Sequence, residues 1–268
     1  MTRILGVDFS GASDAGRKIW IAEGERNGNG ALSLRRCVAA VDLPDGGLPP
    51  QQAVSALARH IASLGQARVG CDFPFSLPRD LVTARTWKSF ALRYAAEFAD
   101  ADSFRTIMRS RHSAVEHKRM TDLIAKTPFN SYNLRLYRQT WWGIAGLLDP
   151  LVRSGSAIVR PQQKLKADKP VLIEVCAACT LKSIDLYPPY KGKRPEHRRA
   201  RRRIMDHFID TEKLEAPVRG LRRLLVDNEG GDALDAVIGA IATAYADLSK
   251  DGDAHQRLEG RVYFEIGV

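Results

Sequence analysis

Two aspartates three residues apart stand at the start of an apolar segment near the C-terminus. In GGDALDAVIGAIATAYAD, residues 230–247, the spacing of Asp232 and Asp235 places both on one face of a helix. In the residues that follow, apolar side chains cover nearly the whole circumference of this helix, which predicts that it is largely buried. Paired carboxylates at the open end of such a helix are suited to binding a cation. A structural role stays open, because acids in a first helical turn also complement the helix dipole.

Three further acids stand at or near the ends of predicted strands. They are Asp8, Asp72 and Glu174, in strands expected over 3–9, 67–72 and 170–175. Each has a structural alternative. Asp8 could cap the turn that follows it, and Asp72 could be a polar stop before the FPFSLP segment, whose prolines prevent further strand pairing. Glu174 could be the partner of a nearby arginine.

The elements between these acids predict an α/β fold. In chain order they are strands at 3–9, 18–22 and 32–41, a helix at 51–64, a strand at 67–72, a helical insertion at about 79–169, a strand at 170–175, a loop at 181–190, helices at 195–208 and 219–226, the acid-bearing helix, and a closing strand at 261–266. The NGNG turn at 27–30 makes the first three strands an antiparallel meander. We therefore expect a single domain over 1–268, with a mixed sheet, flanking helices and the insertion.

The composition of the chain indicates which kinds of molecule it could bind. The 268 residues are 44% hydrophobic, enough for a substantial core, and carry a net charge of +10, which favours polyanionic partners such as nucleic acid. No segment approaches the ~20 apolar residues of a membrane span, and the N-terminus lacks the layout of a signal peptide. We expect a cytoplasmic protein with no membrane partner, in which four cysteines form no disulfide framework.

The order of these elements resembles the ribonuclease-H-like superfamily. There, the first strand and the strand after the first helix lie side by side, each delivers a carboxylate, and a late helix delivers the rest. A closer resemblance, to the family called domain of unknown function 429, rests on GVDFSGA at 6–12, GCDFPFSLP at 70–78, KRMTD at 118–122, QTWWGI at 139–144, IEVCAACTL at 173–181, YKG at 190–192 and DALDA at 232–236. Members of that family are predicted nucleases. The chain departs from the pattern at Cys176 and Cys179, where we would expect an aromatic residue or histidine followed by proline.

The resemblance implies metal-dependent hydrolysis of nucleic acid phosphodiesters. Two cations ~3.5–4 Å apart activate a water and relieve the charge on the leaving oxygen. Mg²⁺ or Mn²⁺ would be held by a few carboxylates plus waters and phosphate oxygens. We expect Asp8 to bridge both ions, Asp72 to hold one, and Asp232 with Asp235 to hold the other. Glu174 is expected to orient ligands from outside or to act as an accessory ligand.

Basic residues supply a candidate nucleic-acid surface. Nine basic and two acidic residues lie between 182 and 203, and Lys191, Lys193, Arg198 and Arg202 could track a phosphate backbone. Alternatively, these basic residues form a solvent-exposed charged surface with no ligand. Trp87, Trp141 and Trp142 could stack on bases, although aromatic residues at helical spacing are more typical of a core.

Other functions stay open. Cys176 and Cys179 have CxxC spacing, which could mark zinc binding or redox chemistry, but Cys37 and Cys71 lie apart and offer no second pair. His112 and His117 are expected to be surface residues rather than ligands. A catalytically inactive nucleic-acid-binding protein of the same fold is the main alternative. An actin-like or sugar-kinase-like ATPase is a further one, with 6–16 as its phosphate loop.

Overall fold

A seven-stranded mixed sheet forms the centre of the molecule. The computed structural model describes residues 2–112, 116–166 and 168–267. The sheet order is β3-β2-β1-β4-β6, with β5 and β7 both pairing with β6. β1 to β3 are antiparallel, and the other pairings are parallel. The strands are β1 (Arg3–Asp8), β2 (Trp20–Arg26), β3 (Leu32–Ala39), β4 (Ala67–Asp72), β5 (Ile158–Val159), β6 (Val171–Val175) and β7 (Val262–Tyr263). The fold class is α/β, and the N-terminal meander is confirmed.

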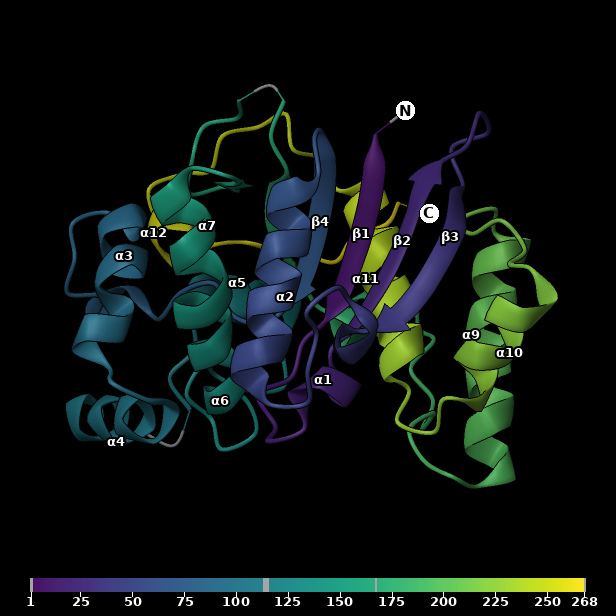
Figure 1. Cartoon of the computed structure of the whole chain (residues 1–268), viewed down its shortest axis with the longest axis horizontal. Coiled ribbons are helices and arrows are strands. Elements are labelled where there is room, and N and C mark those ends of the chain that lie inside the picture. The colour runs from purple at the N-terminus through teal and green to yellow at the C-terminus, as the bar shows by residue number, and fades with distance from the viewer. Residues whose placement is uncertain (1, 113–115, 167, 268) are drawn as a thin grey trace.

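Helices cover both faces of the sheet and extend beyond both edges. In Figure 1, α2 lies in front of the sheet and α11 behind it, while α3, α4, α6 and α7 lie to the left of β4, and α9 and α10 to the right of β3. The helices are α1 (Ala15–Lys18), α2 (Pro50–Ser63), α3 (Trp87–Glu97), α4 (Ala101–Arg111), α5 (Met120–Ala125), α6 (Tyr137–Trp141), α7 (Asp149–Ser154), α8 (Ala177–Ser183), α9 (Pro195–Asp210), α10 (Arg219–Asp227), α11 (Asp232–Tyr245) and α12 (Gln256–Glu259). The 3₁₀ helices η1 (Ala40–Asp42) and η2 (Arg79–Leu81) and the π-helix η3 (Trp142–Leu148) complete the set.

Some predicted boundaries were wrong. The loop expected over 181–190 begins within α8, a helix that opens where the Cys176 sulfur accepts a hydrogen bond from the backbone N–H of Cys179. The helical insertion over 79–169 contains β5, whose two residues are too few to show strand alternation. The closing strand is limited to β7. A short helix, α1, occupies part of the predicted turn after β1.

Strand alternation separates two cores, one on each side of β1. Leu5 and Val7 belong to the core under α2, whereas Ile4 packs with α11. Gly6 lies on the α11 side, where a Cβ atom would stand 2.1 Å from the backbone oxygen of Ala236. On β4, a Cβ at Gly70 would stand 1.9 Å from Oγ1 of Thr243. Glycine at these two positions lets α11 lie directly against the sheet, which fixes where that helix begins.

Adding one methyl group at Gly6 is therefore expected to destabilise the protein. In Gly6→Ala the new Cβ would meet backbone atoms of α11 at 2.1 Å, so the helix must move away from β1. We expect a loss of about 3 kcal/mol in the free energy of unfolding, measured by urea denaturation. The control is Gly65→Ala, whose Cβ would meet no described atom within 4 Å. Equal stability of the two variants would contradict this close helix–strand contact.

Candidate metal centre

Four aspartates from three elements face one cavity. In the parallel pairing of β1 with β4, Asp8 is directly opposite Asp72. Because side chains alternate along a strand, each shares the face of the glycine two residues before it, so both point toward α11. That helix begins at Asp232, after Gly231 turns the chain with φ +78°. Its first turn brings Asp232 and Asp235 to the same cavity of about 340 Å³. The predicted grouping of the four aspartates is therefore present in the structure.

Asp235 is held by two neighbours from a loop between α8 and α9. The hydroxyl of Tyr190 donates to Oδ1 of Asp235 over 2.6 Å, and Nζ of Lys191 lies 2.6 Å from Oδ2. Nη1 of Arg201, a buried residue of α9, donates to the backbone oxygens of Tyr190 and Gly192 over 2.6 and 3.0 Å. The helix α9 thus fixes the loop that carries the lysine to the aspartates.

The placement of Lys191 changes one prediction. The sequence assigned it to a nucleic-acid surface, whereas its ammonium group contacts a carboxylate of the cavity while the side chain remains 54% exposed. Burial acts to lower the pKa of Lys191, but the Asp235 and Asp8 carboxylates outweigh it and raise that pKa above its ordinary value. Lys191 is therefore a positive counter-charge within the carboxylate cluster.

The crowded carboxyl groups are hard to ionise together. Burial raises the pKa of Asp8 well above its ordinary range, and the Asp235 carboxylate raises it further, against the opposing effect of Lys191. The pKa of Asp72 rises to about 7, through burial first and then through Asp235. Burial also raises the pKa of Asp232. A bound cation would relieve this repulsion, which is the electrostatic condition expected of an acidic metal site.

Glu174 lies on the opposite face of the sheet. It pairs in register with Cys71, which belongs to the α2-side core, so its side chain points away from α11. There it receives hydrogen bonds from Nη1 and Nη2 of Arg119 over 2.8 and 2.5 Å and from the backbone N–H of Phe75 over 3.0 Å. Arg119 also binds Asp122 in a bidentate pair, and all three side chains are buried. The arginine-partner interpretation of Glu174 matches this geometry, although Glu174 still lines the cavity.

Removing the arginine should cost stability. Arg119→Met would leave two buried carboxylates, Glu174 and Asp122, without their shared counter-charge. We expect a loss of about 3–5 kcal/mol in the free energy of unfolding, measured by chemical denaturation near neutral pH. The matched control is Arg93→Met, at an exposed position of α3, with little change expected. A loss no larger than that of the control would show that the buried ion pair is dispensable.

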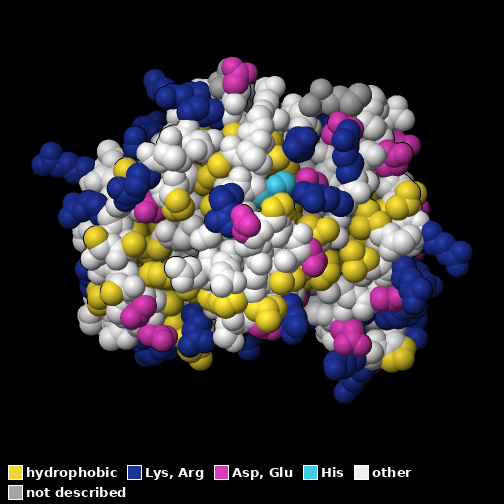
Figure 2. Space-filling view, viewed as in Figure 1, with side chains coloured by type: hydrophobic (Ala, Val, Ile, Leu, Met, Phe, Trp, Pro, Cys, Tyr) yellow, Lys and Arg dark blue, Asp and Glu magenta, His cyan; other side chains and the backbone are white. Residues whose placement is uncertain are grey.

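The remaining predicted basic residues lie on the surface beyond the cavity. Lys193 is 3.9 Å from Glu229, and Arg198 donates to Asp227 over 2.7 Å. Arg202 is exposed and lines a shallow hollow between α9 and α10 with Arg198, Arg219, Arg222 and Arg223. Figure 2 shows basic side chains gathered at the right-hand edge, over these two helices.

The tryptophans serve the core. Trp87 is buried and donates from Nε1 to the backbone oxygen of Phe75, while Trp141 and Trp142 are partly buried against the α2-side core. This agrees with the structural interpretation of the three residues rather than with base stacking.

A second group of possible metal ligands lies away from the cavity. Ligand atoms of Asp80, His112 and His117 lie within 4.8 Å of one another, and Nε2 of His117 is 2.7 Å from Oδ1 of Asp80. The two imidazole rings stack with their centroids 4.0 Å apart and 3° between their planes. His112 follows the last residue of α4 rather than lying within a helix.

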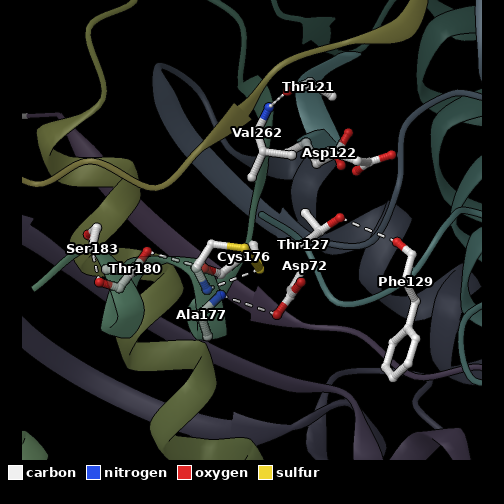
Figure 3. Close-up of a disulfide and its surroundings, with 12 residues drawn as sticks. Asp72, Thr121, Asp122, Thr127, Phe129, Cys176, Ala177, Thr180, Ser183 and Val262 are labelled. Carbon is white, nitrogen blue, oxygen red and sulfur yellow. Dashed lines mark hydrogen bonds between the residues drawn. A yellow bond between two sulfur atoms is a disulfide. The ribbon is translucent and has the colours of Figure 1, made fainter. Parts of the chain in front are cut away.

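The cysteines do not form a zinc site in this structure. Cys176 and Cys179 are joined in a disulfide (Figure 3), and Cys37 and Cys71 are free and buried. The backbone N–H of Ala177, next to Cys176, donates to Oδ2 of Asp72 over 3.4 Å. The disulfide therefore lies beside the aspartate cluster.

Comparison with protein-family models, curated proteins and solved structures gives no match. Among the described residues, no helix has the length and apolar character needed to cross a membrane.

Sequence reasoning missed the direct partners of the acids. Tyr190 falls in the YKG motif, and Arg119 and Asp122 fall in KRMTD, but neither motif predicts a role for these three residues, and Lys191 was expected on a nucleic-acid surface. Their positions far along the chain gave no spacing that could join them to Asp235 or Glu174. The only sequence signal for these contacts is that the YKG and KRMTD motifs occur in the same chain as the acid-bearing motifs.

Proposed function

We propose that this chain is a divalent-metal-dependent nuclease of the ribonuclease-H-like superfamily, related to the domain of unknown function 429 family. The observation that carries the proposal is the gathering of Asp8, Asp72, Asp232 and Asp235 around one cavity, with the ammonium group of Lys191 among them. Four carboxylates around one ammonium group leave an excess of negative charge, and carboxylate oxygens are the ligands that Mg²⁺ or Mn²⁺ favours.

The sheet supports the fold part of the proposal. β1 and β4 are neighbours, their terminal acids are in register, and the late helix α11 brings the other two. This is the arrangement that the superfamily resemblance implies. Residues from motifs spread along the chain also line the same cavity, among them Asp8, Asp72, Asp122, Gln139, Glu174, Lys191 and Asp235.

The residues present fit a divalent cation. Asp8 and Asp72 would hold it from the sheet, and Asp232 and Asp235 from α11. When bound, the metal would supply an activated water and neutralise charge on the leaving oxygen of a phosphodiester. Tyr190 orients Asp235 by its hydrogen bond, so the ligand carboxylate is positioned in advance.

Lys191 has a second use during the reaction. Its long, largely exposed side chain can swing from Asp235 to a phosphate oxygen once the carboxylate binds a cation. It would then stabilise the charge that develops on the phosphate. Lys193 and Arg202 are exposed and lie close to Lys191 along the chain. They would contact phosphates of the bound nucleic acid next to the cleaved bond, without reading its base sequence.

The test is cleavage of a labelled panel of single-stranded, duplex, hybrid and four-way-junction DNA and RNA, with Mg²⁺, Mn²⁺ or chelator. We expect metal-dependent cleavage of at least one substrate, lost in both Asp8→Asn and Asp235→Asn. Mn²⁺ binding is measured on the same samples by electron paramagnetic resonance. Binding of nucleic acid without cleavage and without Mn²⁺ binding would favour the inactive nucleic-acid-binding alternative and overturn the nuclease proposal.

A further inference from the structure

Cys176 and Cys179 lie at the end of the sheet, beside the cavity that the four aspartates line. Cys176 directly follows β6 and begins α8, and its sulfur is bonded to that of Cys179 in the first turn of the helix (Figure 3). The proposed nuclease chemistry uses neither sulfur. A separate role for the pair is therefore open to physical argument.

The two cysteine residues differ in accessibility. Cys176 is partly exposed and lines the cavity, whereas Cys179 is 1% exposed. Nucleophilic attack on a disulfide needs access to the sulfur under attack. A thiol that enters the cavity therefore reaches Cys176, and the sulfur of Cys179 is the one that leaves.

A purely structural role explains the pair poorly. A cross-link between residues three apart closes a very short loop, and short loops restrict the unfolded chain least. The backbone N–H of Thr180 already donates to the oxygen of Cys176 over 2.9 Å, and that of Ala177 donates to Oδ2 of Asp72 over 3.4 Å. The cross-link itself therefore adds little stability beyond these hydrogen bonds, because it restricts the unfolded chain over only a very short loop.

We propose that Cys176 and Cys179 form a reversible thiol–disulfide exchange site whose reaction partner is a dithiol. A thiolate of the partner attacks Sγ of Cys176, the bond to Cys179 breaks, and the Cys179 sulfur leaves with the electron pair and takes up a proton. The second thiolate of the partner then attacks the mixed disulfide, releasing Cys176, which also takes up a proton. Two electrons pass to the protein, and the partner becomes a disulfide.

Exchange at this position takes place next to a proposed metal ligand. Ala177, whose N–H contacts Asp72, adjoins Cys176 in the chain, and Glu174 lies two residues before it. The proposal itself does not depend on metal or nucleic acid, so it is tested without either.

The first experiment places the native full-length chain in buffers of reduced and oxidised dithiothreitol at set ratios, followed by acid quenching, maleimide labelling under denaturing conditions and peptide mass mapping. We expect Cys176 and Cys179 to gain and lose label together across the series, while labelling of Cys37 and Cys71 stays constant. Two thiols that persist in fully oxidised reagent would overturn the proposal, as would a disulfide that is reduced only after unfolding.

The second experiment assigns the attacked sulfur. Cys179→Ser leaves Cys176 at the cavity, and Cys176→Ser leaves only the buried Cys179. With the aromatic disulfide 5,5′-dithiobis(2-nitrobenzoate), we expect Cys179→Ser to form a mixed disulfide about 100-fold faster than Cys176→Ser. Equal rates would contradict attack at Cys176. Should either variant fail to fold, mapping the mixed disulfide of the native chain with glutathione gives the same assignment, and glutathione on Cys179 would contradict it.

Discussion

Asp8→Asn should lower metal-dependent cleavage by about 10³-fold or more while leaving the fold intact. Asp8 stands at the end of β1, in register with Asp72, and faces the start of α11. Asparagine has nearly the same shape but no charge, so the cavity would keep its form while the proposed cation would lose one of its anionic ligands. Under the proposed function, losing the metal's contribution would remove several kcal/mol of transition-state stabilisation. Initial rates at saturating Mn²⁺, together with Mn²⁺ binding, measure this effect.

Stability separates this loss from damage to the fold. The raised pKa values of Asp8 and Asp72 mean that the folded chain keeps protons which the unfolded chain releases near pH 4. Their contribution to the free energy of unfolding is therefore fully present below the ordinary value of 3.8, and it is lost as the pH rises through about 7 for Asp72 and through the raised pKa of Asp8 for that residue. Asp8→Asn removes part of this penalty, so in chelator at pH 8 we expect it to be more stable than the native chain by about 1–3 kcal/mol.

The matched control is Asp45→Asn. Asp45 is exposed and has φ +56°, a conformation that asparagine adopts readily, and its nearest ion-pair partner is Arg59 at 3.6 Å. Activity and stability should stay close to native. If Asp8→Asn cleaves at the native rate, the carboxylate cluster is not the site of the reaction. If it loses activity together with several kcal/mol of stability, the cluster serves the fold.

Much of the fold followed from local pattern. β4 agrees with its predicted strand at both ends, and α2, α9, α10 and α11 lie within a few residues of their predicted positions, because long periodic segments carry their signal in a single window. The misses are short elements, whose formation depends on their neighbours. β5 and β7 each have two residues and exist because β6 offers them an edge. α8 has seven residues and is capped by a sulfur, which is an unusual cap.

In the candidate site, too, some residues could be placed from the sequence and others could not. Asp8 and Asp72 could be placed on one face from sequence, because each follows a glycine by two residues on its strand and the two strands end alike. The same alternation would have placed Glu174 differently: Ile173 and Val175 face α11, so the residue between them faces the other side. Lys191 and Tyr190 could not be placed, because their contact with Asp235 joins segments 45 residues apart through a loop that Arg201 holds.

The affinity of the cavity for Mn²⁺ should rise steeply with pH. A carboxyl group binds the ion only after losing its proton, so metal binding competes with protonation. The pKa of Asp72 is about 7 in the metal-free cavity, and that of Asp8 is also raised well above its ordinary range. Below pH 7 the apparent affinity should fall about tenfold per pH unit from Asp72 alone, and more steeply because Asp8 must also lose a proton. Surface carboxylates with ordinary pKa values would already be ionised at pH 5.5.

Calorimetric titration with Mn²⁺ from pH 5.5 to 8 measures both parts of this argument. Repeating each titration in two buffers of different ionisation enthalpy gives the number of protons released, to which Asp72 should contribute most of one proton near pH 6.5. Asp45→Asn should follow the native curve, while in Asp72→Asn the released proton count should fall because the group that titrates near 7 is gone. An affinity for Mn²⁺ that does not change with pH across this range, with no proton released, would mean that Mn²⁺ binds outside the buried cluster. The four aspartates would then not be a metal site.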